Sequence, residues 1–298
     1  MQNLYTYPLY RPPAEANNII VQVTYGCSYN NCSFCSMYKD KKFQTRTLQE
    51  IYKDIDLLAS NYPTASKVFL ADGDALTLDT NILLKILNYL NKSFPKLRRV
   101  STYASAQNIL SKSNEELQTL YSNKLKLVYF GIETGDNTVL KKITKGVTKE
   151  DMIESLNKVS ASGIKTSATV ILGLAGKNYT KQHIQNTADI VNKTTINYLS
   201  TLQLGLEDDV IEKFYKHFDD FIPLNDVETL DEQKRFIEQI NPTNQVIFRS
   251  NHASNALHLK GTLPKDKNRL LKELHIIEDL GEEALIPKEL RSFWYKWF

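Results

Sequence analysis

Short apolar runs alternate with segments of helical periodicity along the first two thirds of this 298-residue chain. In the helical segments apolar residues recur every three or four positions, which is the spacing of an amphipathic helix. The apolar runs between them are rich in β-branched and aromatic residues and predict strands. Six such strands are expected, at residues 18–25, 67–71, 97–103, 126–132, 165–172 and 197–204. Strand–helix alternation at this spacing predicts parallel strands joined by right-handed crossovers.

Six strand–helix units are too few for a closed eight-stranded barrel. We therefore predict an α/β fold, a partial (β/α)6 TIM-like barrel with a C-terminal α+β extension. The barrel is expected at residues 1–205 and the extension at 206–298, because the alternation stops after the sixth strand. No Gly/Ser/Pro-rich linker separates the two, so the extension should pack on the barrel. The aromatic run at 293–298 is expected to be a packed or interface stripe.

Composition narrows the class of protein further. Apolar residues make up 42% of the chain and charged residues 24%, as in ordinary globular domains. The net charge of +3 is small, so a nucleic-acid partner is not expected, and no apolar run is long enough to span a bilayer. The N-terminus lacks the charged and apolar regions of a signal peptide. These features predict a cytoplasmic protein without a membrane partner.

All three cysteines of the chain lie within nine positions, as Cys27-x4-Cys32-x2-Cys35. An odd, clustered set does not make a disulfide framework and instead indicates soft metal ligands. A structural zinc site needs four ligands, and the nearest histidine in sequence is His183. A zinc-stabilised α/β binding protein is therefore one reading. An iron–sulfur cubane is the other, with three cysteine ligands and one iron open to a small molecule.

The run YGCSYNNCSFCSMYK, at residues 25–39, resembles the cluster loop of the radical S-adenosylmethionine (radical SAM) superfamily. The common family spacing has one residue fewer between the first two cysteines. The resemblance implies that Cys27, Cys32 and Cys35 hold a 4Fe–4S cluster whose fourth iron binds SAM. It also implies reductive cleavage of SAM to a 5′-deoxyadenosyl radical. Phe34 matches a family position beside the adenine, although a core phenylalanine would look the same in sequence.

Two further strand ends resemble family motifs for SAM. Asp72, Gly73 and Asp74 follow the second strand, where family members often carry Gly-Gly-Glu-Pro to bind the SAM amine. The first glycine and the proline of that motif are absent here. Glu133 follows the fourth strand at the position of the family's ribose-binding acid, and a carboxylate suits two hydroxyl donors. A salt bridge at the barrel rim is the alternative for Glu133.

Weaker candidates follow the remaining strands. Ser105 after the third strand and Gly173 after the fifth are further candidate SAM contacts, although Gly173 would also suit an ordinary turn. The polar segment near residue 252 would also suit a hydrogen-bonded loop. The candidate substrate contacts are Tyr103, Gln203, Asn251, His252 and Asn255.

The cluster loop and the Gly131–Gly146 motif look closest to Fe–S oxidoreductases near the oxygen-independent coproporphyrinogen oxidases. The lack of further cysteines argues against an auxiliary cysteine-ligated cluster. We predict a single-cluster radical SAM oxidoreductase that abstracts hydrogen from a small or medium-sized organic substrate. Its expected electron donor is a flavodoxin or ferredoxin. A radical SAM methyltransferase and a nucleic-acid- or peptide-modifying enzyme are the alternatives, and no catalytic side chain is assigned.

Overall fold

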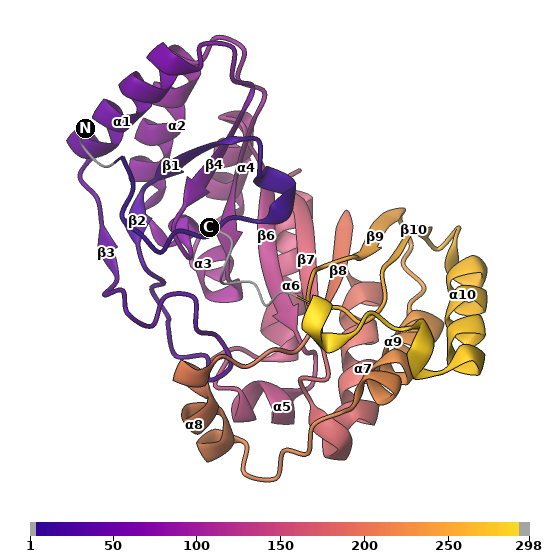
Figure 1. Cartoon of the computed structure of the whole chain (residues 1–298). Coiled ribbons are helices and arrows are strands. Elements are labelled where there is room, and N and C mark those ends of the chain that lie inside the picture. Colours follow the sequence, from indigo (N-terminus) through magenta and orange to yellow (C-terminus); the bar gives the residue numbers. More distant parts are fainter. Residues whose placement is uncertain (1–3, 292–298) are drawn as a thin grey trace.

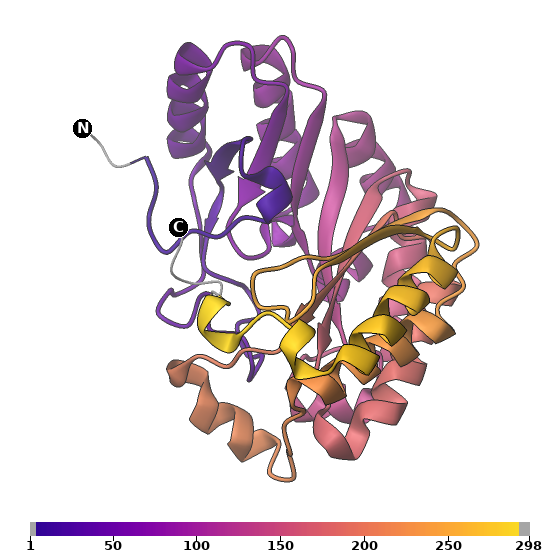
Figure 2. The same ribbon diagram turned by 45° about the vertical axis from the view of Figure 1, so that its right-hand side comes forward.

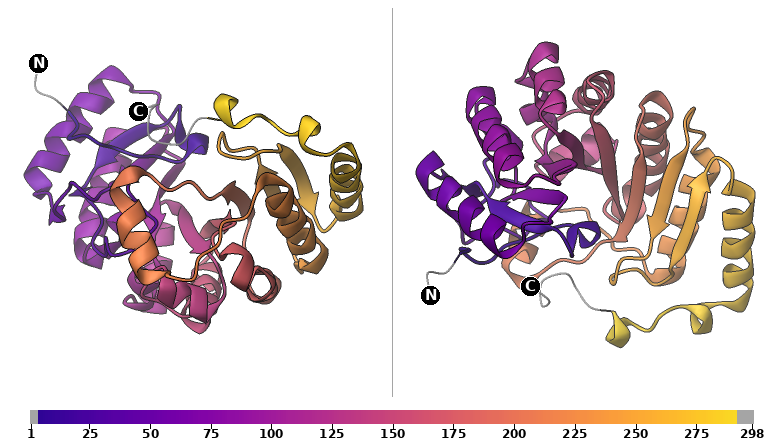
Figure 3. Two further views of the ribbon diagram at one scale, coloured as in Figure 1. Left: turned by 60° about the horizontal axis from the view of Figure 1, so that its bottom comes forward. Right: turned by 90° about the horizontal axis from the view of Figure 1, so that it is seen from above.

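The computed structural model describes residues 4–291, which surround an eight-stranded sheet of order β1-β4-β5-β6-β7-β8-β9-β10. The strands are β1 (Ile19–Gln22), β4 (Lys67–Ala71), β5 (Arg99–Ala104), β6 (Leu125–Glu133), β7 (Lys165–Leu172), β8 (Tyr198–Gln203), β9 (Val246–Ser250) and β10 (Leu259–Leu263). Neighbours from β1 to β9 pair in parallel, and β10 is antiparallel. The sheet curves into an open arc with helices outside it (Figures 1 and 3). The predicted α/β partial barrel and its six strands are confirmed.

Most helices occupy the crossovers between parallel strands and begin at polar caps. Thr47 and Thr148 each form a capping box, and Asp79 accepts from the N–H of Asn81 at 2.8 Å. The helices are α1 (Leu48–Asn61), α2 (Thr80–Ser93), α3 (Ala106–Leu110), α4 (Asn114–Ser122), α5 (Asn137–Lys142), α6 (Lys149–Ala161), α7 (Gly176–Lys193), α8 (Asp208–His217), α9 (Asp226–Gln239) and α10 (Lys267–Leu280). Short 3-10 turns lie at Pro13–Glu15, Ala75–Thr77, Glu282–Ala284 and Lys288–Leu290.

The two faces of the sheet bury different sets of side chains. On β4, Val68 and Leu70 belong to the large core beneath the helices, whereas Phe69 points to the inner face of the arc. The N-terminal segment covers that inner face, where Leu9 packs against Phe69. Glu15 is fully buried there and accepts hydrogen bonds from the side chains of Arg99, Ser101 and Tyr129. The amino-terminal segment thus fills the inside of the first strands.

The predicted extension continues the same sheet. β9 pairs in parallel with β8, and α9 packs against α7 and α10 at the end of the sheet opposite β1 (Figure 2). Backbone pairing therefore crosses the boundary expected at residue 205. The aromatic run at 293–298 lies outside the described residues. Within residues 4–291 no helix has the length and apolar character needed to traverse a bilayer.

Candidate active site

The cysteine loop lies where the parallel strands end, which is where α/β barrels place their chemistry. A small antiparallel pair, β2 (Thr24–Tyr25) and β3 (Gln44–Thr45), encloses it. Gly26 opens the loop at φ 70°, and a Cβ on this residue would lie 2.9 Å from the Lys41 carbonyl oxygen. Only glycine adopts this conformation at such close approach without strain. The loop therefore turns sharply away from the strand before its first cysteine.

Cys27, Cys32 and Cys35 carry free thiols, and each keeps part of its surface exposed. Protein atoms nevertheless crowd the sulfur atoms, and this burial raises the pKa of all three thiols, that of Cys35 to about 12. Backbone N–H groups of Tyr29 and Asn30 oppose the shift at Cys27. Thiols in such surroundings ionise when a metal supplies positive charge. In residues 4–291, no three His, Cys, Asp or Glu side chains gather around one point as ligands of a single ion would.

Several elements hold the cysteine loop in place. The backbone N–H of Ser28 donates to Asp74 Oδ1 at 2.9 Å, and its hydroxyl donates to the other oxygen of that carboxylate. The carbonyl of Asn31 accepts from the Thr144 hydroxyl at 2.6 Å and from Lys213 of α8 at 2.9 Å. Gly73 packs so closely that a Cβ there would lie 2.9 Å from Cys27 Cβ. Asp74 and Gly73 thus contact the cysteine loop, and their predicted contact with SAM stays a prediction.

Asp72, directly after β4, holds the base of the cysteine loop. Its carboxylate is fully buried, and Oδ2 forms an ion pair with Lys41 and accepts from Gln22 Nε2, both at 3.0 Å. Lys41 also donates to the carbonyls of Thr6 and Pro8. These contacts join β1, the end of β4 and the N-terminal segment. In this structure the Asp72 carboxylate binds Lys41 and Gln22 and so holds the loop in place. The predicted contact of Asp72 with SAM stays a prediction.

Glu133 ends β6 at φ 60°, and its Oε1 accepts from Lys145 Nζ at 3.1 Å. Lys145 lies between this carboxylate and Cys32, 5.9 Å from the centre of the Phe34 ring. Burial alone would lower the pKa of Lys145. The negative charges of Glu133 and Cys32 outweigh this effect and raise the pKa above its usual value. Through Lys145 the structure brings Glu133 and Phe34 near Cys32, and the predicted contacts of Glu133 and Phe34 with SAM stay predictions. Gly131 provides the room, because a Cβ there would lie 2.0 Å from Glu133 Oε1.

Lys145 is the site residue that sequence reasoning missed. It follows the short helix α5 and lies twelve positions after Glu133, so no local periodicity connects the two. Its signal was a lysine inside the strand-end motif that ends at Gly146. A lysine at that place can return to the end of the strand and provide a partly buried positive charge.

The other two candidate SAM contacts have backbone roles. The Ser105 hydroxyl accepts from the N–H of Asn108 at 3.2 Å and so caps α3. Gly173 has φ 77°, and its N–H donates to Glu232. A Cβ on Gly173 would meet nothing nearer than 3.9 Å, so one side of this glycine is open.

The candidate substrate residues separate into two groups. Tyr103 belongs to the inner face of the barrel, where its ring centre lies 5.2 Å from that of Phe69. Asn255 is buried, and its amide donates at 2.8 Å to the Thr201 carbonyl and accepts at 2.8 Å from the N–H of Gln203.

His252 binds the N–H and hydroxyl of Ser254, while Asn251 is exposed. The bonds from Asn255 to Thr201 and Gln203 tie the 251–258 loop to β8. They fit the hydrogen-bonded loop that the sequence left as the alternative to substrate contacts.

A buried ion pair that the sequence did not predict fixes the end of the described chain. Arg291 binds both oxygens of Asp226, at 2.8 and 2.9 Å, and Gln203 Nε2 donates to the same carboxylate at 2.7 Å. His183, considered above as a zinc ligand, is buried in α7 with Nδ1 2.8 Å from the Thr134 hydroxyl.

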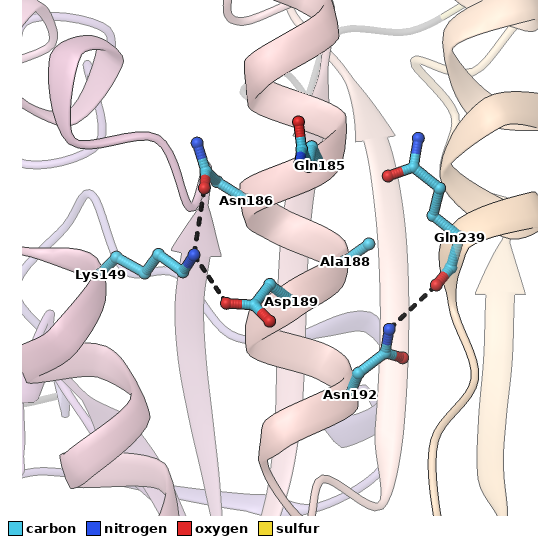
Figure 4. A pocket seen from close by; sticks show the side chains of 7 residues that line it. All are labelled: Lys149, Gln185, Asn186, Ala188, Asp189, Asn192 and Gln239. Atoms are coloured by element: carbon cyan, nitrogen blue, oxygen red, sulfur yellow. Dashed lines mark hydrogen bonds and ion pairs between the residues drawn. The ribbon is translucent and has the colours of Figure 1, made fainter.

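A cavity of about 310 Å³ lies on the outer helical layer, away from the strand ends (Figure 4). Lys149 crosses from α6 to Asp189 and Asn186 of α7, and Asn192 donates to the carbonyl of Gln239. These bonds join neighbouring helices. The cavity has no contact with the residues predicted for the cofactor site.

Comparison with known proteins gives one family. Residues 21–191 match the sequence profile of the Radical SAM superfamily. An uncharacterized methyltransferase of Pyrococcus horikoshii, PH0819, is 24% identical over 60% of this chain and 38% of its own length. The tRNA-2-methylthio-N(6)-dimethylallyladenosine synthase of Fusobacterium nucleatum is 25% identical over 59% of this chain and 41% of its length. The chain thus spans about two fifths of these curated relatives.

Among solved structures, coproporphyrinogen III oxidase from Escherichia coli matches with a TM-score of 0.55. The two chains are 14% identical, and the match covers 74% of this chain and 51% of that one. At this identity the likeness supports the fold. The oxidase is one of several structural neighbours, so the expected grouping near it is one of several that the fold allows.

Proposed function

The chain belongs to the radical SAM superfamily, and from that premise we propose a single-cluster enzyme that abstracts hydrogen from a small or medium-sized organic substrate. Enzymes of this family use a 4Fe–4S cluster and SAM. The observation that supports the proposal is the position of Cys32, one of three free thiols in the loop at the strand ends, beside the ion pair of Glu133 and Lys145.

In the proposed site Cys27, Cys32 and Cys35 hold the cluster. The cluster, once reduced and with SAM bound, would supply a 5′-deoxyadenosyl radical. Glu133 accepts hydrogen bonds from the ribose hydroxyls, and Lys145 keeps the Glu133 carboxylate in place.

Phe34 and the partly buried loop restrict water around the reacting groups. A flavodoxin or ferredoxin is the proposed electron donor.

The test is anaerobic reconstitution with iron and sulfide, followed by reduction with SAM present. We expect about four irons and four sulfides per chain and production of 5′-deoxyadenosine. Glu133→Gln should keep the iron and weaken SAM binding about 10- to 100-fold by calorimetry, because a charge-assisted hydrogen bond contributes about 1.5–3 kcal/mol. Glu154→Gln, on the exposed face of α6, is the matched control. A colourless protein that holds one zinc would contradict the proposal.

Methyl or methylthio transfer to a nucleic acid or protein is the second candidate. The names of the two relatives describe a methyltransferase and a tRNA methylthiolation enzyme. The net charge of +3 favours the small-molecule substrate. S-adenosylhomocysteine formed in cell extract would indicate methyl transfer, whereas extract-dependent 5′-deoxyadenosine without it supports hydrogen abstraction alone.

A further inference from the structure

Two serine hydroxyls in the cysteine loop are buried and have no hydrogen-bond partner in the described part of the chain. They are Ser33 and Ser36, and each directly follows a cysteine, Cys32 or Cys35. Ser33 is fully buried. A buried hydroxyl without a partner destabilises the fold, so such groups ordinarily have an acceptor.

The surroundings of the loop contain an acceptor for its remaining serine hydroxyl. Ser28, one position after Cys27, donates its hydroxyl to Asp74. Ser33 is held by its backbone instead, because its N–H donates to the Ile143 carbonyl at 2.9 Å. The two serine hydroxyls of the loop that lack acceptors are thus those after the second and third cysteines. In the complete enzyme the acceptors beside these serines would be the sulfides of the cluster and the thiolates of the cysteines that hold it.

We propose that Ser33 and Ser36 donate O–H···S hydrogen bonds to the cluster and raise its reduction potential. The inference rests on the proposed role of the three cysteines. Reduction adds one negative charge to the cluster, so a donor to its sulfur atoms stabilises the reduced form more than the oxidised form. Hydrogen bonds to sulfur are among the features that set iron–sulfur potentials. In this chain the two serines would ease the electron transfer that precedes cleavage of SAM.

The test compares midpoint potentials of the reconstituted full-length enzyme, measured by redox titration with electron paramagnetic resonance. Ser33→Ala, Ser36→Ala and the double variant should each bind cluster and resist reduction. We expect an equilibrium constant for reduction about tenfold lower per serine, which is ~59 mV for one electron. Ser36→Thr retains the hydroxyl and should keep the wild-type potential. Ser122→Ala, exposed at the end of α4, is the control.

A second measurement covers the case in which Ser33→Ala loses iron. Electron paramagnetic resonance of the reduced wild-type cluster in D2O should show magnetic coupling between the cluster and exchangeable deuterons. This coupling should weaken in Ser36→Ala. Unchanged potentials and unchanged coupling in fully loaded variants would overturn the hydrogen-bond proposal alone. A wild-type protein that takes up no iron would overturn the proposed function as well.

Discussion

The buried ion pair beneath the cysteine loop allows a quantitative test of how that loop is held. Lys41 and Asp72 approach to 3.0 Å, with 7% and 0% of their side chains exposed. Lys41→Met removes the positive charge and leaves the carboxylate buried. Breaking such a pair from one side costs about 3–5 kcal/mol, which is a large part of the 5–15 kcal/mol typical of a folded domain.

The carboxylate itself indicates what the double variant should do. Burial raises the pKa of Asp72, even though Tyr38 and Lys41 act to lower it. The cost of desolvating the carboxylate therefore exceeds what its partners return. Replacing both members, as Lys41→Met with Asp72→Asn, removes that cost together with the attraction. The double variant should accordingly be roughly 1–3 kcal/mol more stable than Lys41→Met alone.

Urea unfolding of the metal-free protein, followed by circular dichroism, measures these differences. The two single variants and the double variant complete a cycle, provided that the denaturant dependence of the unfolding free energy is unchanged. If the double variant loses the sum of the two single losses, the pair is not coupled and the reasoning is wrong. If Asp72→Asn keeps its stability but loses SAM affinity, Asp72 contacts the cofactor and does not act as an anchor.

Two further predictions concern the loop and the extension. Gly73→Ala would place a Cβ 2.9 Å from that of Cys27, so we expect the variant to retain less iron after gel filtration, and unchanged iron would show that the loop has room to move. Burial, with His258, lowers the pKa of His252 to about 4, so His252 stays neutral in the fold while the unfolded chain binds a proton below about pH 6.5. Stability should fall by on the order of 3 kcal/mol as the pH drops from about 6.5 to 4, and His252→Asn should show a smaller fall in urea midpoint; an equal fall would contradict this assignment.

The strands could be predicted from sequence because each is a short apolar run between polar caps. The run at 67–71 is apolar at consecutive positions from 68 on, and in the structure these side chains are buried on both faces of the sheet, in the outer core and on the inner face. The continuation of the sheet by β9 was not predicted, because pairing with β8 depends on the fold around it. Glu15 shows the same limit. Its acidic side chain is fully buried only because Arg99 and two hydroxyls, more than 80 positions away in sequence, surround it.

The sequence indicates a candidate site most directly where one residue type has one chemical use, as with the three cysteines. Such a site is less predictable for amides and hydroxyls, which serve the backbone equally well. Asn255 and Ser105 lie near strand ends as expected, yet both use their side chains to bind backbone groups. Lys145 was missed for the opposite reason. Its position beside Glu133 depends on the path of the chain after α5, which no local pattern encodes.

The described cysteine loop has almost no regular secondary structure, so its shape depends on bonds from elements distant in sequence. Asp74 holds its first turn, and Thr144 and Lys213 hold its middle. These bonds use the loop's backbone groups and the Ser28 hydroxyl, and none of them uses a cysteine sulfur. A loop fixed in this way loses little conformational freedom when a cluster binds, which favours tight retention. The same arrangement makes α8 a support of the cysteine loop, since removal of Lys213 would release a carbonyl located next to Cys32.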